Sequence, residues 1–361
     1  MVSTSGPKNI VYLFGAGSTH AERLLECRIQ KTGYDKKTGE LSVGLTAERV
    51  SEGVISLLLK KDPDLLNRYG IDEASMNPPT GRRKVDVELF ISMLETLRTN
   101  QSEKDASVLR KYFYSEINKR LFVDRTKLTP RLHAALVEWH KINSLSEKLT
   151  ACLTVNYDSM YEESCDLVKS HFDYGFNAKT LNTHYKKGES YLLKLHGSFD
   201  WQLDSEAPMV AVSKAVPADS MLWIPPKLNK EYLGYPYNII HGRAEEALRG
   251  CDILRVVGCS LSQNDLGLIS LLFKTQKTGE KNKYVIEYIG SESGRNQLDE
   301  RLGMLLSVDE SFYQKADYLR LGKDPTNNYF LDWLYYLTAN SKKSKAGTKY
   351  LKNVKKWTSL S

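Results

Sequence analysis

Short apolar runs that end abruptly at glycine or at polar side chains constrain the fold of this chain more than any other feature. Residues 9–14, 149–155 and 190–195 form such runs, as buried strands do. The segments that follow them are Gly15-Ala16-Gly17-Ser18-Thr19, Asn156-Tyr157-Asp158 and His196-Gly197-Ser198. Because ligands of open α/β sheets bind beyond the carboxyl ends of strands, these ends predict one shared pocket.

The chain after residue 148 alternates between strand and helix patterns. Further strands are expected over 171–174, 220–224, 252–257 and 283–289. Helical spacing of apolar residues covers 159–169, 238–249, 264–275, 294–306 and 327–339. Strands that alternate with helices favour a parallel sheet covered on both faces, so we predict an α/β fold with a Rossmann-like sheet.

A long helical interval separates the first strand from the second, because about 135 residues are too many for one crossover connection. Helical spacing covers 47–60, 87–98, 106–120 and 130–145, the last with Thr129 as the expected N-cap before Pro130. We therefore predict a discontinuous Rossmann-like domain over 1–45 and 148–339, a helical insertion over 46–147 and a C-terminal tail over 340–361.

The net charge of +7 is concentrated in that tail. The tail holds seven lysines, and without them 44 basic residues face 44 acidic ones. Nucleic-acid binding is therefore expected only through the tail, where a solvated C-terminus is the favoured interpretation. No apolar run reaches the roughly 18 residues of a membrane helix, and the first residues lack a signal-peptide pattern. We expect a cytoplasmic protein that does not bind membranes.

The cysteines predict neither a zinc module nor a disulfide framework. There are five, with no C-x-x-C pair among them. Cys152 and Cys259 lie inside apolar strand patterns, where a thiol behaves as a small buried hydrophobe. We expect no metal site and no catalytic cysteine.

The first strand end is a candidate phosphate site. Gly15, Ala16 and Gly17 let a ligand approach the backbone, and the helix that follows offers free N–H donors. Ser18 and Thr19 add hydroxyl donors. The alternative is a tight turn in which Ser18 or Thr19 caps the helix.

The second strand end places an amide and a carboxylate together. Asn156 could orient a ribose hydroxyl or a water molecule, and Asp158 could hold that arrangement in place. Asp158 could equally be only the cap of the next helix, with Asn156 as a turn residue.

His196 is the best candidate for acid–base chemistry. It ends the run at Leu195 and precedes Gly197, so its imidazole should lie at the rim of the sheet. An imidazole titrates near neutral pH, which suits a general base. A further strand end offers Gly258 and Ser260 as ligand contacts, although the loop there could simply end at an Asp265 helix cap.

These motifs resemble those of sirtuin-fold proteins in their order along the chain. The matching segments are Gly15-Ala16-Gly17, Thr154-Val155-Asn156-Tyr157-Asp158, Lys194-Leu195-His196-Gly197-Ser198 and Gly258-Cys259-Ser260-Leu261-Ser262. The Asn-Tyr-Asp form is most similar to bacterial sirtuin-like effectors that cleave NAD in antiphage defence. The resemblance spans residues 9 to about 290 and leaves out the helical insertion and the tail.

The resemblance implies a Rossmann-like sheet of sirtuin type with NAD as substrate and with Asn156 and His196 as catalytic residues. It implies NAD binding at Gly15, Ala16, Gly17, Ser18, Thr19, Asp158, Gly258 and Ser260. The paired zinc cysteines and the Gly-Ile-Pro-Asp-Phe-Arg stretch of sirtuin deacetylases are missing, which disfavours deacetylation.

We therefore expect a hydrolase that cleaves the nicotinamide–ribose bond in antiphage defence. The resemblance further implies gating by homo-oligomer assembly or by a partner defence protein. The alternative is a catalytically silent subunit that binds NAD or a related nucleotide and regulates a partner.

Overall fold

The computed structural model describes most of the chain in several stretches. These are residues 6–33, 44–71, 85–204, 209–213, 216, 220–224, 234–261, 265–276, 284–291, 294–298, 300–301, 316–318, 328–331, 333–334 and 337. The tail predicted over 340–361 lies outside the described residues. Parts of the helices predicted over 294–306 and 327–339 also lie outside them.

A parallel sheet of six strands forms the centre of the fold, in the order β11-β10-β9-β1-β4-β6. The strands are β1 (Lys8–Phe14), β4 (Glu147–Thr154), β6 (Tyr191–Lys194), β9 (Ile253–Val257), β10 (Val285–Ile289) and β11 (Ala316–Tyr318). Residues Ile10–Leu13 and all of β9 are buried. This burial explains why these runs are apolar apart from Arg255 in β9, as expected for a parallel sheet covered on both faces. The predicted α/β class with a parallel sheet is confirmed.

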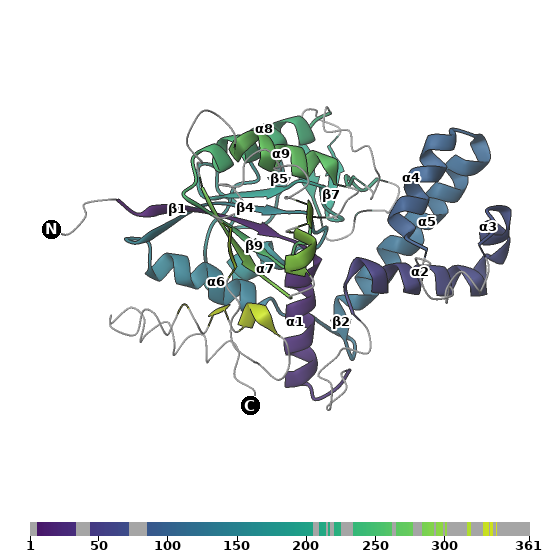
Figure 1. The fold of residues 1–361 in the computed structure, drawn as a ribbon, viewed down its shortest axis with the longest axis horizontal. Coiled ribbons are helices and arrows are strands. Elements are labelled where there is room, and N and C mark those ends of the chain that lie inside the picture. The colour runs from purple at the N-terminus through teal and green to yellow at the C-terminus, as the bar shows by residue number, and fades with distance from the viewer. Residues whose placement is uncertain are drawn as a thin grey trace.

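Helices cover both faces of the sheet (Figure 1). One face carries α8 (Tyr237–Arg249) and α9 (Leu266–Gln276), and the other carries α1 (Ala16–Ile29), α6 (Arg131–Ile142) and α7 (Met160–Val168). The sheet and these helices share one apolar core. These helices cover the faces of the sheet and leave the edge at the carboxyl ends of its strands accessible.

Four further helices form an arm that projects from this body (Figure 1). They are α2 (Ala47–Lys61), α3 (Pro63–Arg68), α4 (Val87–Leu97) and α5 (Asn100–Arg120). Thr46 caps α2, Asp86 caps α4, and a capping box between Thr99 and Ser102 starts α5. The arm has its own buried cluster, and Tyr157 and Trp223 from the sheet side pack against it.

The domain boundaries at 45/46 and 147/148 stay a prediction. Two further observations bear on them. Helix α6, inside that interval, packs in the core of the sheet. A short antiparallel pair, β2 (Phe122–Val123) and β3 (Thr126–Lys127), connects α5 to α6.

Two predicted strands and one predicted cap are wrong. Segments 171–174 and 220–224 make only isolated bridges, because Phe172, Asp173 and Trp223 each pair with a neighbour at a single point and not along a continuous ladder. A separate sheet of β5 (Ala178–Thr180), β7 (Trp201–Leu203) and β8 (Val210–Val212) lies between them in the chain. Thr129 is not the cap of α6; Pro130 holds that position, without a side-chain hydrogen bond. The Glu22 carboxylate instead accepts the N–H groups of Leu132 and His133 in the first turn of α6.

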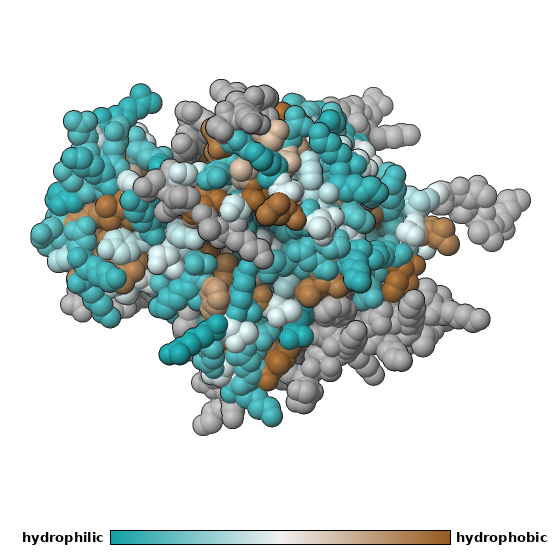
Figure 2. Space-filling model, turned by 180° about the vertical axis from the view of Figure 1, so that it is seen from behind, coloured by the Kyte–Doolittle hydropathy of each residue, from teal (hydrophilic) through white to brown (hydrophobic). Residues whose placement is uncertain are grey.

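The face seen in Figure 2 is mostly hydrophilic, and its apolar side chains are scattered in small groups over the body and the arm. Scattered apolar residues of this kind are usual on protein surfaces. No helix among the described residues is both long and apolar enough to cross a membrane.

Candidate active site

A cavity of about 700 Å³ lies at the carboxyl edge of the main sheet. It is lined by residues that follow β1, β4, β6, β9 and β10, and by residues of the helical arm. The chain runs from β1 through β4 to β6 on one side of the sheet and then returns to β9 on the other side of β1. Ligands of open α/β sheets bind at such a reversal of strand order. The volume is within the range of roughly 300–1,000 Å³ that is usual for small-molecule sites.

The glycines of the first turn allow two loops to touch. A Cβ atom on Gly17 would lie 2.7 Å from Gly258 Cα, and one on Gly258 would lie 2.4 Å from the Ser18 nitrogen. Gly258 also has φ +58°, a conformation that favours glycine. The N–H groups of Gly15 and Gly17 donate to the carbonyls of Val257 and Gly258, at 3.1 and 2.9 Å. These N–H groups are therefore engaged within the protein.

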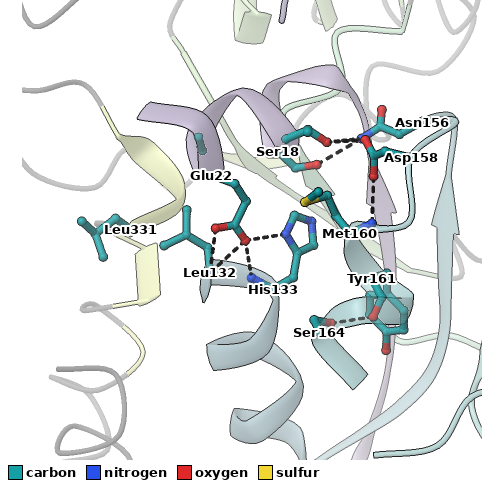
Figure 3. A network of polar contacts seen from close by, with 12 residues as sticks. Ser18, Glu22, Leu132, His133, Asn156, Asp158, Met160, Tyr161, Ser164 and Leu331 are labelled. Atoms are coloured by element: carbon teal, nitrogen blue, oxygen red, sulfur yellow. Dashed lines mark hydrogen bonds and ion pairs between the residues drawn. The ribbon is translucent and has the colours of Figure 1, made fainter. Parts of the chain in front are cut away.

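Asn156 and Asp158 fasten the loop after β4 to the first turn of α1 (Figure 3). The Asn156 amide nitrogen donates to the Gly15 carbonyl and to Thr19 Oγ1, both at 3.0 Å. Thr19 Oγ1 donates onward to Asp158 Oδ2 at 2.7 Å. In Figure 3 the Asn156 amide oxygen points away from Ser18, so the fixed amide presents its acceptor on the opposite side.

Asp158 also caps the helix that follows, because the Met160 N–H donates to its Oδ1 at 3.1 Å. The fully buried Lys194 ammonium donates to the Asp158 carbonyl and to Glu162 Oε1, the second of these bonds at 2.9 Å. Burial raises the pKa of Glu162, and the nearby Lys194 ammonium opposes that shift. The buried Lys194–Glu162 pair therefore helps to fix the position of the loop after β4.

His196 forms a pair with Asp265 at the rim of the sheet. The distance from His196 Nε2 to Asp265 Oδ2 is 2.8 Å, and both side chains are buried. The other carboxylate oxygen of Asp265 accepts the Leu268 N–H of α9 at 3.2 Å. The carboxylate therefore places the ring hydrogen on Nε2, which makes Nδ1 the basic nitrogen of the neutral ring. It can also stabilise the imidazolium that forms when His196 takes up a proton.

An aromatic cluster borders the cavity beside His196. The Tyr157 ring lies 6.2 Å from the His196 ring and stacks on Phe199 at 5.0 Å. Phe113 from the helical arm stacks on Trp223 at 6.0 Å, and Phe113 and Tyr157 both line the cavity. Phe113 and Tyr157 thus give the cavity an aromatic wall on the side of His196.

The charge of the cavity wall is negative. Glu48 and Glu88 from the arm join Asp158 and Asp265 from the sheet in lining it. Over the described part of the chain, neither lysine nor arginine contributes to this wall. An anionic ligand would therefore depend on N–H and O–H donors, while positive charge on a ligand would be favoured.

The structure brings nine of the ten predicted site residues to one cavity. They are Gly15, Ala16, Gly17, Thr19, Asn156, Asp158, His196, Gly258 and Ser260. Ser18 is the exception: it is buried outside the cavity wall, and its hydroxyl donates to the Gly15 carbonyl at 2.8 Å.

The sequence interpretation missed several residues of the cavity wall. Asp265 was expected only as a helix cap, and its pairing with His196 depends on α9 lying beside the end of β6. His20 follows the glycine turn directly, which could have singled it out. No local sequence pattern singles out Glu48, Glu88 or Phe113 as site residues, because only the position of the arm brings them to the cavity.

All five cysteines are free and buried, which confirms the burial predicted for Cys152 and Cys259. Burial raises the pKa of the Cys152 thiol to about 12, so it stays protonated at neutral pH. Within the described residues, no group of three or more His, Cys, Asp or Glu side chains could hold a metal ion.

Comparisons with known proteins give structural likenesses only. No protein-family model matches the chain, and no curated protein matches it. Among solved structures, Sir2Tm bound to a propionylated peptide matches at 11% identity and a TM-score of 0.38, over 93% of this chain and 94% of the other.

Two further solved structures show the same level of similarity. A Sir2–p53 peptide–NAD+ complex matches at 11% identity and a TM-score of 0.34, over 93% of this chain and 94% of the other. A mutant Sir2 homologue in complex with ADP ribose matches at 14% identity and a TM-score of 0.33, over 84% and 94%. At these TM-scores the likenesses carry no argument about the chemistry of this chain.

Proposed function

We propose that this protein hydrolyses NAD at the nicotinamide–ribose bond, giving nicotinamide and ADP-ribose. The observation that carries the proposal is the meeting of the His196–Asp265 pair and the fixed Asn156 amide in one cavity at the strand-order reversal. The order of the sequence motifs, which resembles that of sirtuin-like effectors, supplies the substrate.

The proposed reaction uses water as the nucleophile. Its oxygen bonds to C1′ of the ribose as the C1′–nitrogen bond breaks, and nicotinamide leaves neutral with the bonding electron pair. The water proton passes to His196, whose imidazolium is stabilised by Asp265. The Asn156 amide oxygen would orient the ribose or the water. The transition state resembles an oxocarbenium ion, and the carboxylates of the cavity wall favour its positive charge.

The motif resemblance extends the proposal to the biological setting. We place the activity in the cytoplasm, in antiphage defence through depletion of NAD. An ungated enzyme of this kind would harm its host, so we propose gating by homo-oligomer assembly or by a partner protein. The basic tail is the proposed surface for any contact with nucleic acid. Residues 46–147 are the proposed insertion domain, which closes the cavity through its arm.

The test is nicotinamide release from NAD by the purified full chain, measured over a range of protein concentrations. We expect release by the wild type, with a rate per chain that rises with concentration if assembly is the gate. Asn156→Ala and His196→Ala should each lower the rate by roughly 10²-fold or more. Unchanged release in both variants would refute the assignment. NAD binding without release at every concentration would favour a silent nucleotide-binding subunit.

A further inference from the structure

His20 stands in the cavity wall without a role in the reaction proposed above. It is the fifth residue of α1, and its side chain lines the cavity. The Leu45 N–H donates to His20 Nδ1 at 3.2 Å. Because Nδ1 accepts this bond, the neutral ring carries its hydrogen on Nε2.

The segment that holds His20 is itself held firmly. Arg120, paired with Glu116 at 2.6 Å, donates to the carbonyls of Gly44 and Arg49 on either side of Leu45. A Cβ atom on Gly44 would lie 3.3 Å from His20 Cε1, so the backbone of this segment lies directly against the ring. The imidazole therefore has a fixed position and a fixed tautomer.

The ring stays neutral at physiological pH. Burial and the nearby Arg23 guanidinium lower the pKa of His20 to about 4. Its Nε2–H is then a neutral donor, and within the described residues no hydrogen-bond acceptor satisfies it.

A dinucleotide needs such a donor in this cavity. The described wall has no lysine or arginine. The N–H groups of Gly15, Gly17 and Ser18, which the sequence suggested for a phosphate, already donate within the protein. His20 lies on the same end of α1 as these groups, where the helix dipole also favours an anion.

We propose that His20 is a substrate-binding residue whose Nε2–H donates to a phosphate oxygen of the dinucleotide. This inference rests on the proposed function and adds a phosphate contact to it. His20 takes no part in bond breaking, so its loss weakens binding of the product as much as binding of the substrate.

The test is calorimetric binding of ADP-ribose to the full chain and to three variants. His20→Phe keeps a ring but has no donor, and we expect at least about tenfold weaker binding, the worth of one hydrogen bond. His20→Gln keeps both an acceptor for Leu45 and a donor, and should bind within about threefold of the wild type. His171→Phe alters an exposed histidine outside the cavity wall and should bind like the wild type.

Each other outcome overturns the assignment. His20→Phe binding like the wild type would show that no contact exists. His20→Gln binding as weakly as His20→Phe would show that a hydrogen-bond donor at position 20 does not account for the binding. A wild type that binds no ADP-ribose would refute the proposed function as well, which separates the two failures. A readout without substitution is the ¹⁵N-histidine spectrum of the wild type, assigned with His20→Gln. Its Nε2–H signal should shift with ADP-ribose, and an unmoved signal contradicts the contact.

Discussion

Asp265 has two contacts that a single substitution can separate. One carboxylate oxygen faces His196 Nε2 and the other accepts the Leu268 N–H at the start of α9. Asparagine keeps a cap acceptor but removes the negative charge beside the imidazole, whereas alanine removes both contacts. The residue thus links the structure of a helix to the chemistry of the site.

We expect Asp265→Asn to lower nicotinamide release by on the order of 10²-fold with little change in stability, because the imidazolium loses its counter-charge. Asp265→Ala should lower nicotinamide release by the same factor. It should also lower the free energy of unfolding by about 1 kcal/mol, because the Leu268 N–H loses its acceptor at the start of α9. Release kinetics and urea unfolding of both variants check these outcomes. Full activity in Asp265→Asn would show that the pair is only structural.

Gly258 is the glycine whose replacement should be most damaging near the site. Its φ of +58° and the 2.4 Å approach of a Cβ atom to the Ser18 nitrogen both oppose any side chain. We expect Gly258→Ala to lower the free energy of unfolding by about 2 kcal/mol or more. It should also weaken ligand binding, because the added methyl group separates the loop after β9 from the loop after β1. The control is Gly242→Ala within α8, where a Cβ atom meets nothing within 4 Å. Gly242→Ala should raise the free energy of unfolding by roughly 0.5–1 kcal/mol. If both variants lost the same stability in urea unfolding, the special role of Gly258 would be contradicted.

At the scale of elements, Glu22 joins two helices that lie far apart in sequence (Figure 3). This buried carboxylate on α1 accepts the N–H groups of Leu132 and His133 at the start of α6, at 2.8 and 2.9 Å. It also contacts His133 Nδ1 at 2.7 Å. A side chain from another helix thus replaces the local cap that α6 lacks.

We expect Glu22→Ala to destabilise the protein by about 3 kcal/mol, because buried N–H donors are left unsatisfied. Glu246→Ala, which removes an exposed ion pair with Arg243 on α8, should cost less than about 0.5 kcal/mol. Chemical denaturation of the two variants gives the comparison. A similar small cost for both would mean that water replaces Glu22 at the helix start.

The elements of the main sheet could be predicted because their burial imposes a local pattern. The buried residues of β1, Ile10–Phe14, carry no charge or amide because helices cover both faces of the sheet. Segments 171–174 and 220–224 have strand-like composition, but pairing depends on neighbours that no local pattern records. The cap of α6 was missed for the same reason, because Glu22 lies more than a hundred residues away.

The candidate site shows the same division between local and distant information. Asn156 and His196 could be found because each directly follows an apolar run, and the strand order then brings them together. Asp265 and Phe113 reach the cavity only through the packing of α9 and of the arm. Site residues that directly follow strands could thus be predicted from the sequence. Site residues on helices could not, because their place at the cavity depends on how the helices pack.

At the scale of the whole molecule, a buried polar network spans the sheet beneath the site. Arg255 on β9 bonds to Glu147 on β4, to Glu287 on β10 and to the Tyr12 hydroxyl on β1. His140 on α6 completes it through Tyr12, at 2.8 Å. Although burial alone would raise the pKa of Glu147, the Arg255 guanidinium holds it below its usual range. Four strands therefore share one set of charges.

This network predicts that the protein loses stability in mild acid. Burial, and then the Arg255 charge, lower the pKa of His140 from 6.5 to about 3. Between these values the unfolded chain binds a proton that the folded chain does not. The free energy of unfolding therefore falls as pH falls from about 6.5, by up to about 1.4 kcal/mol per pH unit. His20 acts in the same direction, since its pKa is lowered to about 4.

The measurement is urea unfolding of the wild type and of His140→Gln at pH 7 and pH 5, a window above the titration of Glu147. Glutamine can bond to the Tyr12 hydroxyl but takes up no proton in either state. The loss of stability between the two pH values should therefore be smaller in the variant by about 2 kcal/mol. An equal loss in both proteins would mean that His140 is protonated in the folded state, and the network would then have to hold a second buried cation beside Arg255.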